Sequence, residues 1–98
     1  MRNTNQTLRE LSEITGATKR VIDFLAGYPV IFNDAMRSSR TYMDEGLSMY
    51  LAQEITLCSR VAMYFKSISQ SELDKVNWRE VNFHASEVIA KAAGTYNR

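Results

Sequence analysis

Apolar residues recur every three to four positions along most of this 98-residue chain, which is the spacing of one face of a helix. Residues that break helices are sparse, with one proline, Pro29, and four glycines. No alternating apolar and polar run is long enough for a strand, and residues 28–32 are the one candidate for extended structure or for a linker. The pattern predicts an all-α fold, a single domain over residues 1–98 with about five helices.

The start of the chain predicts two short helices around a tight turn. Thr7 followed by Glu10 is a capping box, so a helix should begin at Thr7. Gly16 stands where that helix stops, because glycine adopts a left-handed turn freely, and Thr18 can cap a second helix that Gly27 ends. The apolar positions that would pack the two helices together are Leu8, Leu11, Val21, Ile22 and Leu25. This arrangement is typical of a helix-turn-helix, whose second helix can lie in the major groove of DNA.

A further resemblance rests on eight positions, which are Thr7, Glu10, Leu11, Thr15, Gly16, Arg20, Ile22 and Phe24. In these positions residues 7–27 resemble the N-terminal helix-turn-helix of the MerR family of transcription regulators. The resemblance implies a DNA-binding regulator, and it ends at Gly27, because the next residues, Tyr-Pro-Val-Ile-Phe, do not form a basic wing. No cysteine cluster for sensing metals follows in the sequence either.

If the second helix is a recognition helix, its first turn reaches base edges and phosphates. The residues that would face the groove are Thr18, Lys19, Arg20 and Asp23. A carboxylate faces phosphates unfavourably, so Asp23 would accept from a cytosine amine or pair with Lys19. The same pattern also fits a helical hairpin of a bundle with a solvated face. Charge does not decide, since residues 1–42 hold six Lys and Arg against four Asp and Glu, a net +2, and the whole chain carries +1.

Two further helices are expected at about residues 31–44 and 47–66. The second of them carries only three charges, on Glu54, Arg60 and Lys66. Its apolar residues form one stripe, made of Leu47, Leu51, Ile55, Cys58, Val61, Ala62 and Phe65. A helix that is apolar around most of its circumference is buried on more than one side. We therefore predict that it is the central helix or a subunit interface, and that the helical part over residues 31–94 forms a homodimer held largely by residues 47–65.

The last helical segment opens with a second capping box, from Ser69 to Glu72. Gly94 is expected to end it. The positions that recur at helical spacing and should face the core are Trp78, Val81, Ala85, Val88, Ile89 and Ala92.

Arg79 and His84 form the one pair of residues that suggests catalysis. Their Arg-x-x-x-x-His spacing resembles the motif of HEPN-domain ribonucleases, over these two residues only. Five residues apart on a helix, they point about 140° away from each other, so they do not converge within one chain. His84 also stands four residues after Glu80, with which it can pair.

The remaining composition narrows the classes of function. One cysteine, Cys58, excludes an internal disulfide, and with a single histidine it argues against a structural zinc site. Cys58 itself is expected to be a buried small hydrophobic residue. No apolar run reaches the length of a membrane span and no signal peptide is recognised, so we expect a cytoplasmic protein without a membrane segment. No glycine-rich phosphate loop or nucleophile motif is present, so we predict neither an enzyme nor a cofactor.

Two functions of different classes fit these observations. The one we predict is a small DNA-binding transcription regulator, a homodimer that presents Lys19 and Arg20 to two half-sites of double-stranded DNA. The alternative is a small helical protein that inhibits or adapts another protein. The hairpin sequence favours the regulator, whereas the near-zero net charge and the methionines and tyrosines of residues 36–64 favour the alternative. A HEPN-like ribonuclease is a third.

Overall fold

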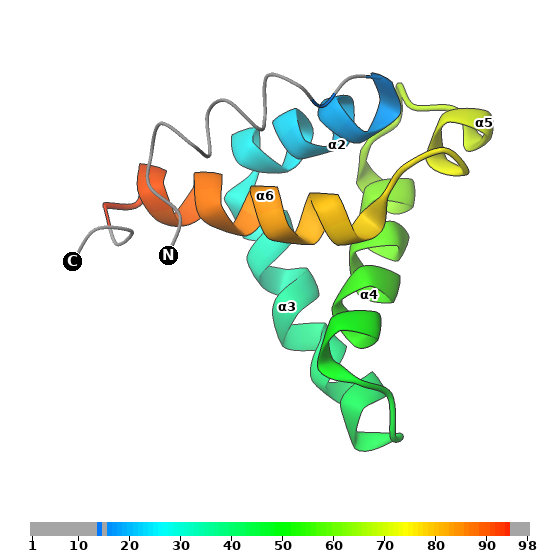
Figure 1. Cartoon of the computed structure of the whole chain (residues 1–98), viewed down its shortest axis with the longest axis vertical. Coiled ribbons are helices and arrows are strands. Elements are labelled where there is room, and N and C mark those ends of the chain that lie inside the picture. The colour runs from blue at the N-terminus through cyan, green and yellow to red at the C-terminus, as the bar shows by residue number, and fades with distance from the viewer. Residues whose placement is uncertain (1–13, 15, 95–98) are drawn as a thin grey trace.

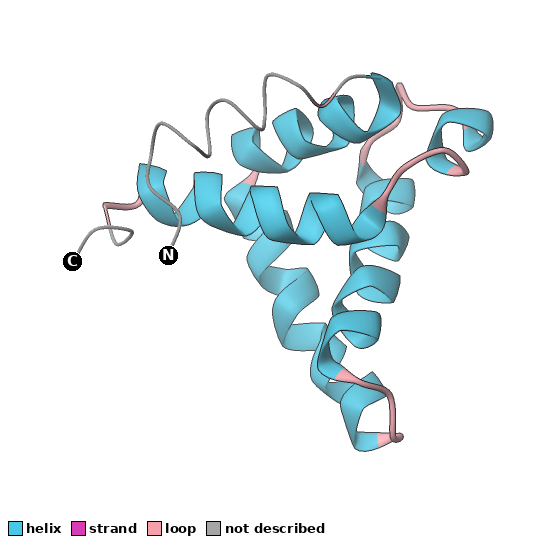
Figure 2. Cartoon of the chain, in the orientation of Figure 1, coloured by secondary structure: helices cyan, strands magenta, loops and turns pink. Residues whose placement is uncertain are grey.

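The structure of the chain is a computed structural model that describes residue 14 and residues 16–94. All regular structure in these residues is α-helical (Figure 2). The helices are α2 (Gly16–Gly27), α3 (Pro29–Asp44), α4 (Met49–Tyr64), α5 (Gln70–Leu73) and α6 (Trp78–Ala92). The all-α prediction is therefore confirmed for the described part of the chain. The helix predicted to begin at Thr7 starts outside the described residues.

The longer helices form two pairs that cross (Figure 1). α3 and α4 lie side by side and antiparallel as a hairpin, whose far end extends away from the other helices. α2 and α6 pack against each other and lie across the near end of this hairpin. The short α5 stands beside the C-terminal end of α4. Because the pairs cross, α2 and α6 cover only one end of the hairpin.

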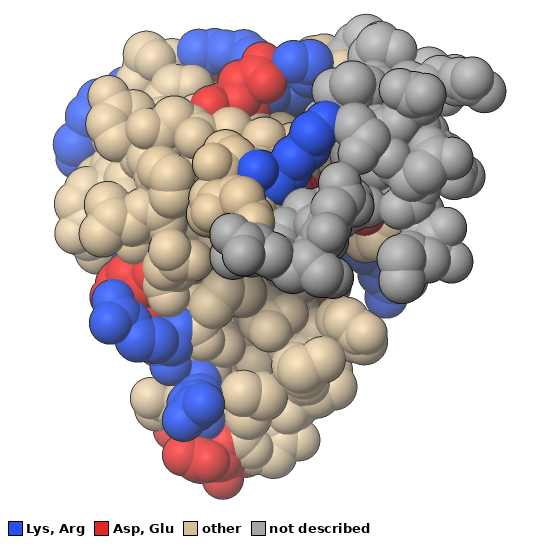
Figure 3. Space-filling view, turned by 90° about the vertical axis from the view of Figure 1, so that its left-hand side faces the viewer, with Lys and Arg blue, Asp and Glu red and all other residues tan. Residues whose placement is uncertain are grey.

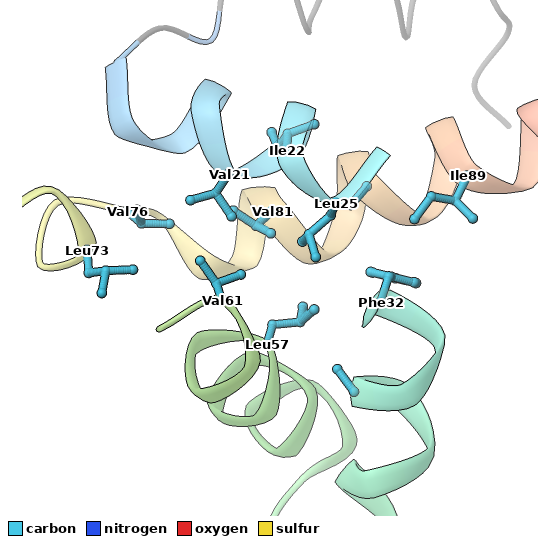
Figure 4. Close-up of a cluster of buried hydrophobic side chains, with 12 residues drawn as sticks. Val21, Ile22, Leu25, Phe32, Leu57, Val61, Leu73, Val76, Val81 and Ile89 are labelled. Atoms are coloured by element: carbon cyan, nitrogen blue, oxygen red, sulfur yellow. The ribbon is translucent and has the colours of Figure 1, made fainter. Parts of the chain in front are cut away.

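The hydrophobic core lies where the two pairs cross (Figure 4). It contains Val21, Ile22, Leu25, Phe32, Ala35, Leu57, Val61, Leu73, Val76, Val81, Ala85 and Ile89. The three apolar residues of α2 that the sequence assigns to helix packing belong to this core, where α6 lies against their helix. The core therefore joins residues from both ends of the described chain.

Small side chains line the contact between α3 and α4. The buried residues of the hairpin outside the hydrophobic core are Ser39, Ala52 and Thr56. The Ser39 and Thr56 hydroxyls donate to carbonyl oxygens of their own helices at 2.6 and 2.7 Å, so neither is left without a partner. Arg60 links the two helices at the side, because its Nε donates to the Asp34 carboxylate and a terminal nitrogen donates to the Ser38 hydroxyl, both at 2.8 Å.

Residues 29–32 are helical, which corrects the expectation of extended structure or a linker over residues 28–32. α3 begins at Pro29, so Tyr28 alone separates it from α2. Proline suits this first helical position because its φ is already helical and its missing N–H would have no partner there. The boundary between α3 and α4 lies close to the predicted one, since α3 ends at Asp44 and α4 begins at Met49. Gly46 takes a φ of +102° in this turn, and Ser48 caps α4.

The last segment is divided, where the sequence suggests one helix from Ser69 onward. The predicted capping box of Ser69 and Glu72 is present, but the helix that it opens, α5, has only four residues. Asn77 then caps α6 by accepting a hydrogen bond from the backbone N–H of Glu80 at 3.2 Å. A short polar side chain such as that of Asn77 competes for backbone groups and starts a new helix.

Candidate interaction surfaces

The start of α2 places Thr18 differently from the prediction. α2 begins at Gly16, so Thr18 lies inside its first turn and does not cap it. Gly16 has a φ of +68°, the left-handed conformation predicted for it. Thr18 is only 9% exposed, and its hydroxyl oxygen accepts a hydrogen bond from the backbone N–H of Asn77 at 3.0 Å. Thr18 therefore ties α2 to the start of α6, and its hydroxyl is engaged within the chain.

The other residues predicted to contact DNA lie on the solvent side of α2. Lys19 pairs with Asp23 at 2.7 Å, as their spacing of four predicts. The Arg20 guanidinium pairs with the Glu72 carboxylate and lies 5.2 Å from the centre of the Phe65 ring. Each cation of this surface therefore faces a carboxylate of the same chain.

The pairing with Arg20 lowers the pKa of the Glu72 carboxyl. The hydrogen bond from Arg20 holds the pKa of the Glu72 carboxyl below its ordinary value, and the backbone N–H of Ser69 acts in the same direction. On the face drawn in Figure 3, too, positive side chains are scattered and several have carboxylates beside them, rather than forming one band. The α2 surface therefore carries little net positive charge of the kind that attracts phosphates.

The side of α4 that faces the core differs from the predicted stripe. The buried residues are Ala52, Thr56, Leu57 and Val61. Of the predicted stripe only Val61 is among them, whereas Leu51 and Ile55 are 49% and 37% exposed. Apolar residues occur on both sides of α4, so spacing alone does not tell which side packs inward. The side that faces α3 carries Ala52 and Thr56, whose small side chains let α3 approach closely.

The solvent side of α4 is consequently apolar. We call Leu51, Ile55, Cys58 and Ala62 the outer face of α4, since they lie opposite its buried residues. This face carries no charge. α4 also holds most of the exposed large hydrophobic residues of the described chain, namely Met49, Tyr50, Leu51, Ile55, Met63 and Tyr64. Cys58 is half-buried, and burial followed by the nearby Asp74 charge raises the pKa of its thiol.

A groove of about 850 Å³ opens where α3, α4 and α6 meet. Its lining residues are Phe32, Met36, Tyr50, Gln53, Glu54, Arg79, Glu80, Asn82, Phe83 and Ser86. We call it the α3/α4/α6 groove. The amide of Asn82 donates to the side-chain oxygen of Gln53 at 2.9 Å and so joins the α4 and α6 walls. The sequence prediction missed this site, although the methionines and tyrosines of residues 36–64 signalled an adaptable apolar surface.

Charged groups of both signs stand in this groove. Arg79 comes from α6 and Glu54 from α4, and neither forms an ion pair with another described residue. Glu80 also lines the groove, where its carboxylate bonds to the Nε2 atom of His84 at 2.9 Å, the pairing that the sequence predicts. His84 itself is 2% exposed and does not line the groove. Arg79 and His84 therefore do not share one site within the chain.

Neither a metal site nor a membrane span is found among the described residues. No three His, Cys, Asp or Glu side chains there gather into a group that could hold a metal ion. None of the described helices has both the length and the apolar character to cross a membrane. No protein-family model, curated protein or solved structure matches this chain.

Proposed function

We propose that this protein acts by binding another protein, and that the α3/α4/α6 groove receives an amphipathic helical segment of that partner. The observation that carries the proposal is the composition of the groove, in which Phe32, Met36, Tyr50 and Phe83 supply apolar surface next to a few polar groups. Binding sites for apolar ligands have this composition. Among protein ligands, an amphipathic helix presents a matching stripe of side chains.

The charges of the groove indicate what else the partner segment carries. Arg79 offers a guanidinium to a carboxylate from the α6 side, and a guanidinium holds a carboxylate through two parallel hydrogen bonds. Glu54 offers a carboxylate from the α4 side. A segment with an acidic residue on one flank of its apolar stripe and a basic residue on the other therefore fits in one direction only. Met36 has a flexible side chain that adapts to the shape of the apolar residues.

A displayed library of amphipathic helical peptides tests this proposal directly. The apolar positions are kept at helical spacing and the flanking positions are randomised. Selection on the wild-type chain should enrich Asp or Glu at one fixed flanking position. Selection on Arg79→Glu should enrich Lys or Arg at that same position, because the charge that meets it is reversed. Failure of any peptide to be enriched over a library of scrambled sequences would refute the proposal.

A matched pair of tyrosine variants locates the bound peptide. Tyr50 lines the groove and is 63% exposed, whereas Tyr64, on the same helix, is 52% exposed and lies outside it. Neither truncation opens a cavity in the core. Fluorescence anisotropy of an enriched peptide should show at least a tenfold loss of affinity for Tyr50→Ala and no change for Tyr64→Ala. Equal affinity for both variants would place the peptide elsewhere.

DNA binding by α2 is a second candidate, favoured by one observation. Lys19 and Arg20 are adjacent on the solvent side of α2, and their ion pairs are partly exposed to water. Exposed pairs contribute between about 0 and 1 kcal/mol, so phosphates can replace the carboxylates at small cost. A gel-shift titration with a random duplex at about 50 mM salt tests this candidate, since nonspecific electrostatic binding is strong there. No shift, or an equal shift for the Lys19→Ala, Arg20→Ala double variant, would argue against it.

A further inference from the structure

The outer face of α4 has a gradient of side-chain size along the helix. Leu51 and Ile55 stand in its first half, Cys58 stands near the middle, and Ala62 stands in its second half. Leu51 and Ala62 are separated by about 16 Å along the axis. A surface that is bulky at one end and small at the other matches a reversed copy of itself. Two such helices placed antiparallel set each bulky half against a small half.

The charges at the two ends of α4 favour the same arrangement. Asp44 and Glu45 precede the helix at the α3–α4 turn, and Lys66 follows its end. An antiparallel pairing brings Lys66 of one copy toward the acidic turn of the other. A parallel pairing would instead bring like charges together at both ends. The four side chains of the face are uncharged, and the carboxylate nearest to Cys58 is that of Asp74, which comes from outside α4.

We propose that two copies of this chain pair through the outer faces of their α4 helices, antiparallel, around a twofold axis between Ile55 and Cys58. Leu51 of one copy then lies against Ala62 of the partner subunit, and the same contact repeats on the other side of the axis. The small Ala62 side chain allows the helix axes to approach to about 8–10 Å. None of the residues lining the α3/α4/α6 groove belongs to this face, so the pairing does not depend on the function proposed above.

The size of the face sets the expected strength of the pairing. α4 is about 24 Å long, and one helix face of that length offers less than the roughly 800 Å² per partner of a typical stable interface. We therefore expect a dimer that exchanges with monomer at micromolar concentration. Sedimentation velocity over about 1–200 µM should show the average mass rising from one chain toward two. A wild-type chain that stays monomeric at the highest concentration would refute the proposal.

Charge substitutions on the face test which surface is used. Leu51 and Ile55 are partly exposed in the monomer, so Leu51→Glu with Ile55→Glu leaves the fold intact while burying four charges in the dimer. This variant should remain monomeric throughout the range, with unchanged helical circular dichroism. Tyr64→Glu, an exposed position away from the face, should dimerise like the wild type. Dimerisation of the double Glu variant would show that another surface holds the copies together.

Disulfide crosslinking tests the direction of the pairing. Two Cys58 thiols close to the axis should be joined by copper phenanthroline and dioxygen, which remove two electrons and two protons as the S–S bond forms. On a Cys58→Ser background, Leu51→Cys and Ala62→Cys chains should crosslink to each other when mixed, and each alone should crosslink little. Crosslinks of Leu51→Cys chains to themselves, or an absence of mixed crosslinks, would refute the antiparallel arrangement.

Discussion

Replacing Thr18 with valine tests whether its hydroxyl holds the start of α6. The two side chains have nearly the same shape, so packing against the core is kept, while the acceptor of the Asn77 backbone N–H is removed. A donor left without a partner costs about 1–3 kcal/mol when it is buried. Asn77 is an exposed residue, which lets water reach part of this site. We therefore expect a loss of about 1–2 kcal/mol in the free energy of unfolding, the lower part of that range.

The expected loss is large enough to measure in several ways. For a domain of this size, 1 kcal/mol lowers Tm by about 4–8 °C, so Thr18→Val should melt roughly 5–15 °C below the wild type. Thr18→Ser is the matched control, since it keeps the hydroxyl and removes one methyl group at about 0.8 kcal/mol. Amide hydrogen exchange distinguishes the valine variant from the serine variant, because the backbone amide of Asn77 should lose protection from exchange in the valine variant only. A valine variant with wild-type Tm and a protected Asn77 amide would refute the assigned role of Thr18.

Two further predictions concern Glu72 and the orientation of α4. The pKa of Glu72 in the folded chain lies below its ordinary value, so the stability that its carboxylate contributes is present above about pH 4.3 and is lost as pH falls through the folded pKa. Urea midpoints should therefore fall more steeply between pH 5 and pH 3 for the wild type than for Glu72→Gln, and parallel pH profiles would contradict this. Leu57→Ala should cost about 2–5 kcal/mol because Leu57 is fully buried, whereas Leu51→Ala, measured at concentrations where the chain is monomeric, should cost less than about 0.5 kcal/mol. Equal losses in these two variants would mean that the buried side of α4 is assigned wrongly.

Local signals in the sequence predict most of the helices. Pro29 and Gly46 mark boundaries, and Ser69 with Glu72 marks a helix start, because each acts through its own backbone geometry. The division between α5 and α6 is harder to predict. The apolar spacing continues through residues 73–81, and the Asn77 cap that ends this continuity is a single polar residue.

The faces of the helices are less predictable than their positions. α4 has apolar residues on both sides, so its periodicity fits two orientations that differ by about half a turn. The choice is made by its neighbour α3, which packs where Ala52 and Thr56 leave room. The groove is harder still to predict from the sequence. Its lining comes from three helices, and their crossing brings Phe32, Tyr50 and Phe83 together. No spacing within one helix encodes such a crossing.

The far end of the α3–α4 hairpin has a consequence for how the chain responds to proteases. It extends beyond α2 and α6, so it is only two helices thick, and nearly all residues from 40 to 51 are exposed there (Figure 1). Opening this tip breaks few buried contacts, whereas the core lies at the other end. Cleavage at the exposed turn around Gly46 would therefore leave two fragments that the core and the Arg60–Asp34 bridge still hold together. The same turn is where the chain would best tolerate an inserted peptide or a permuted terminus.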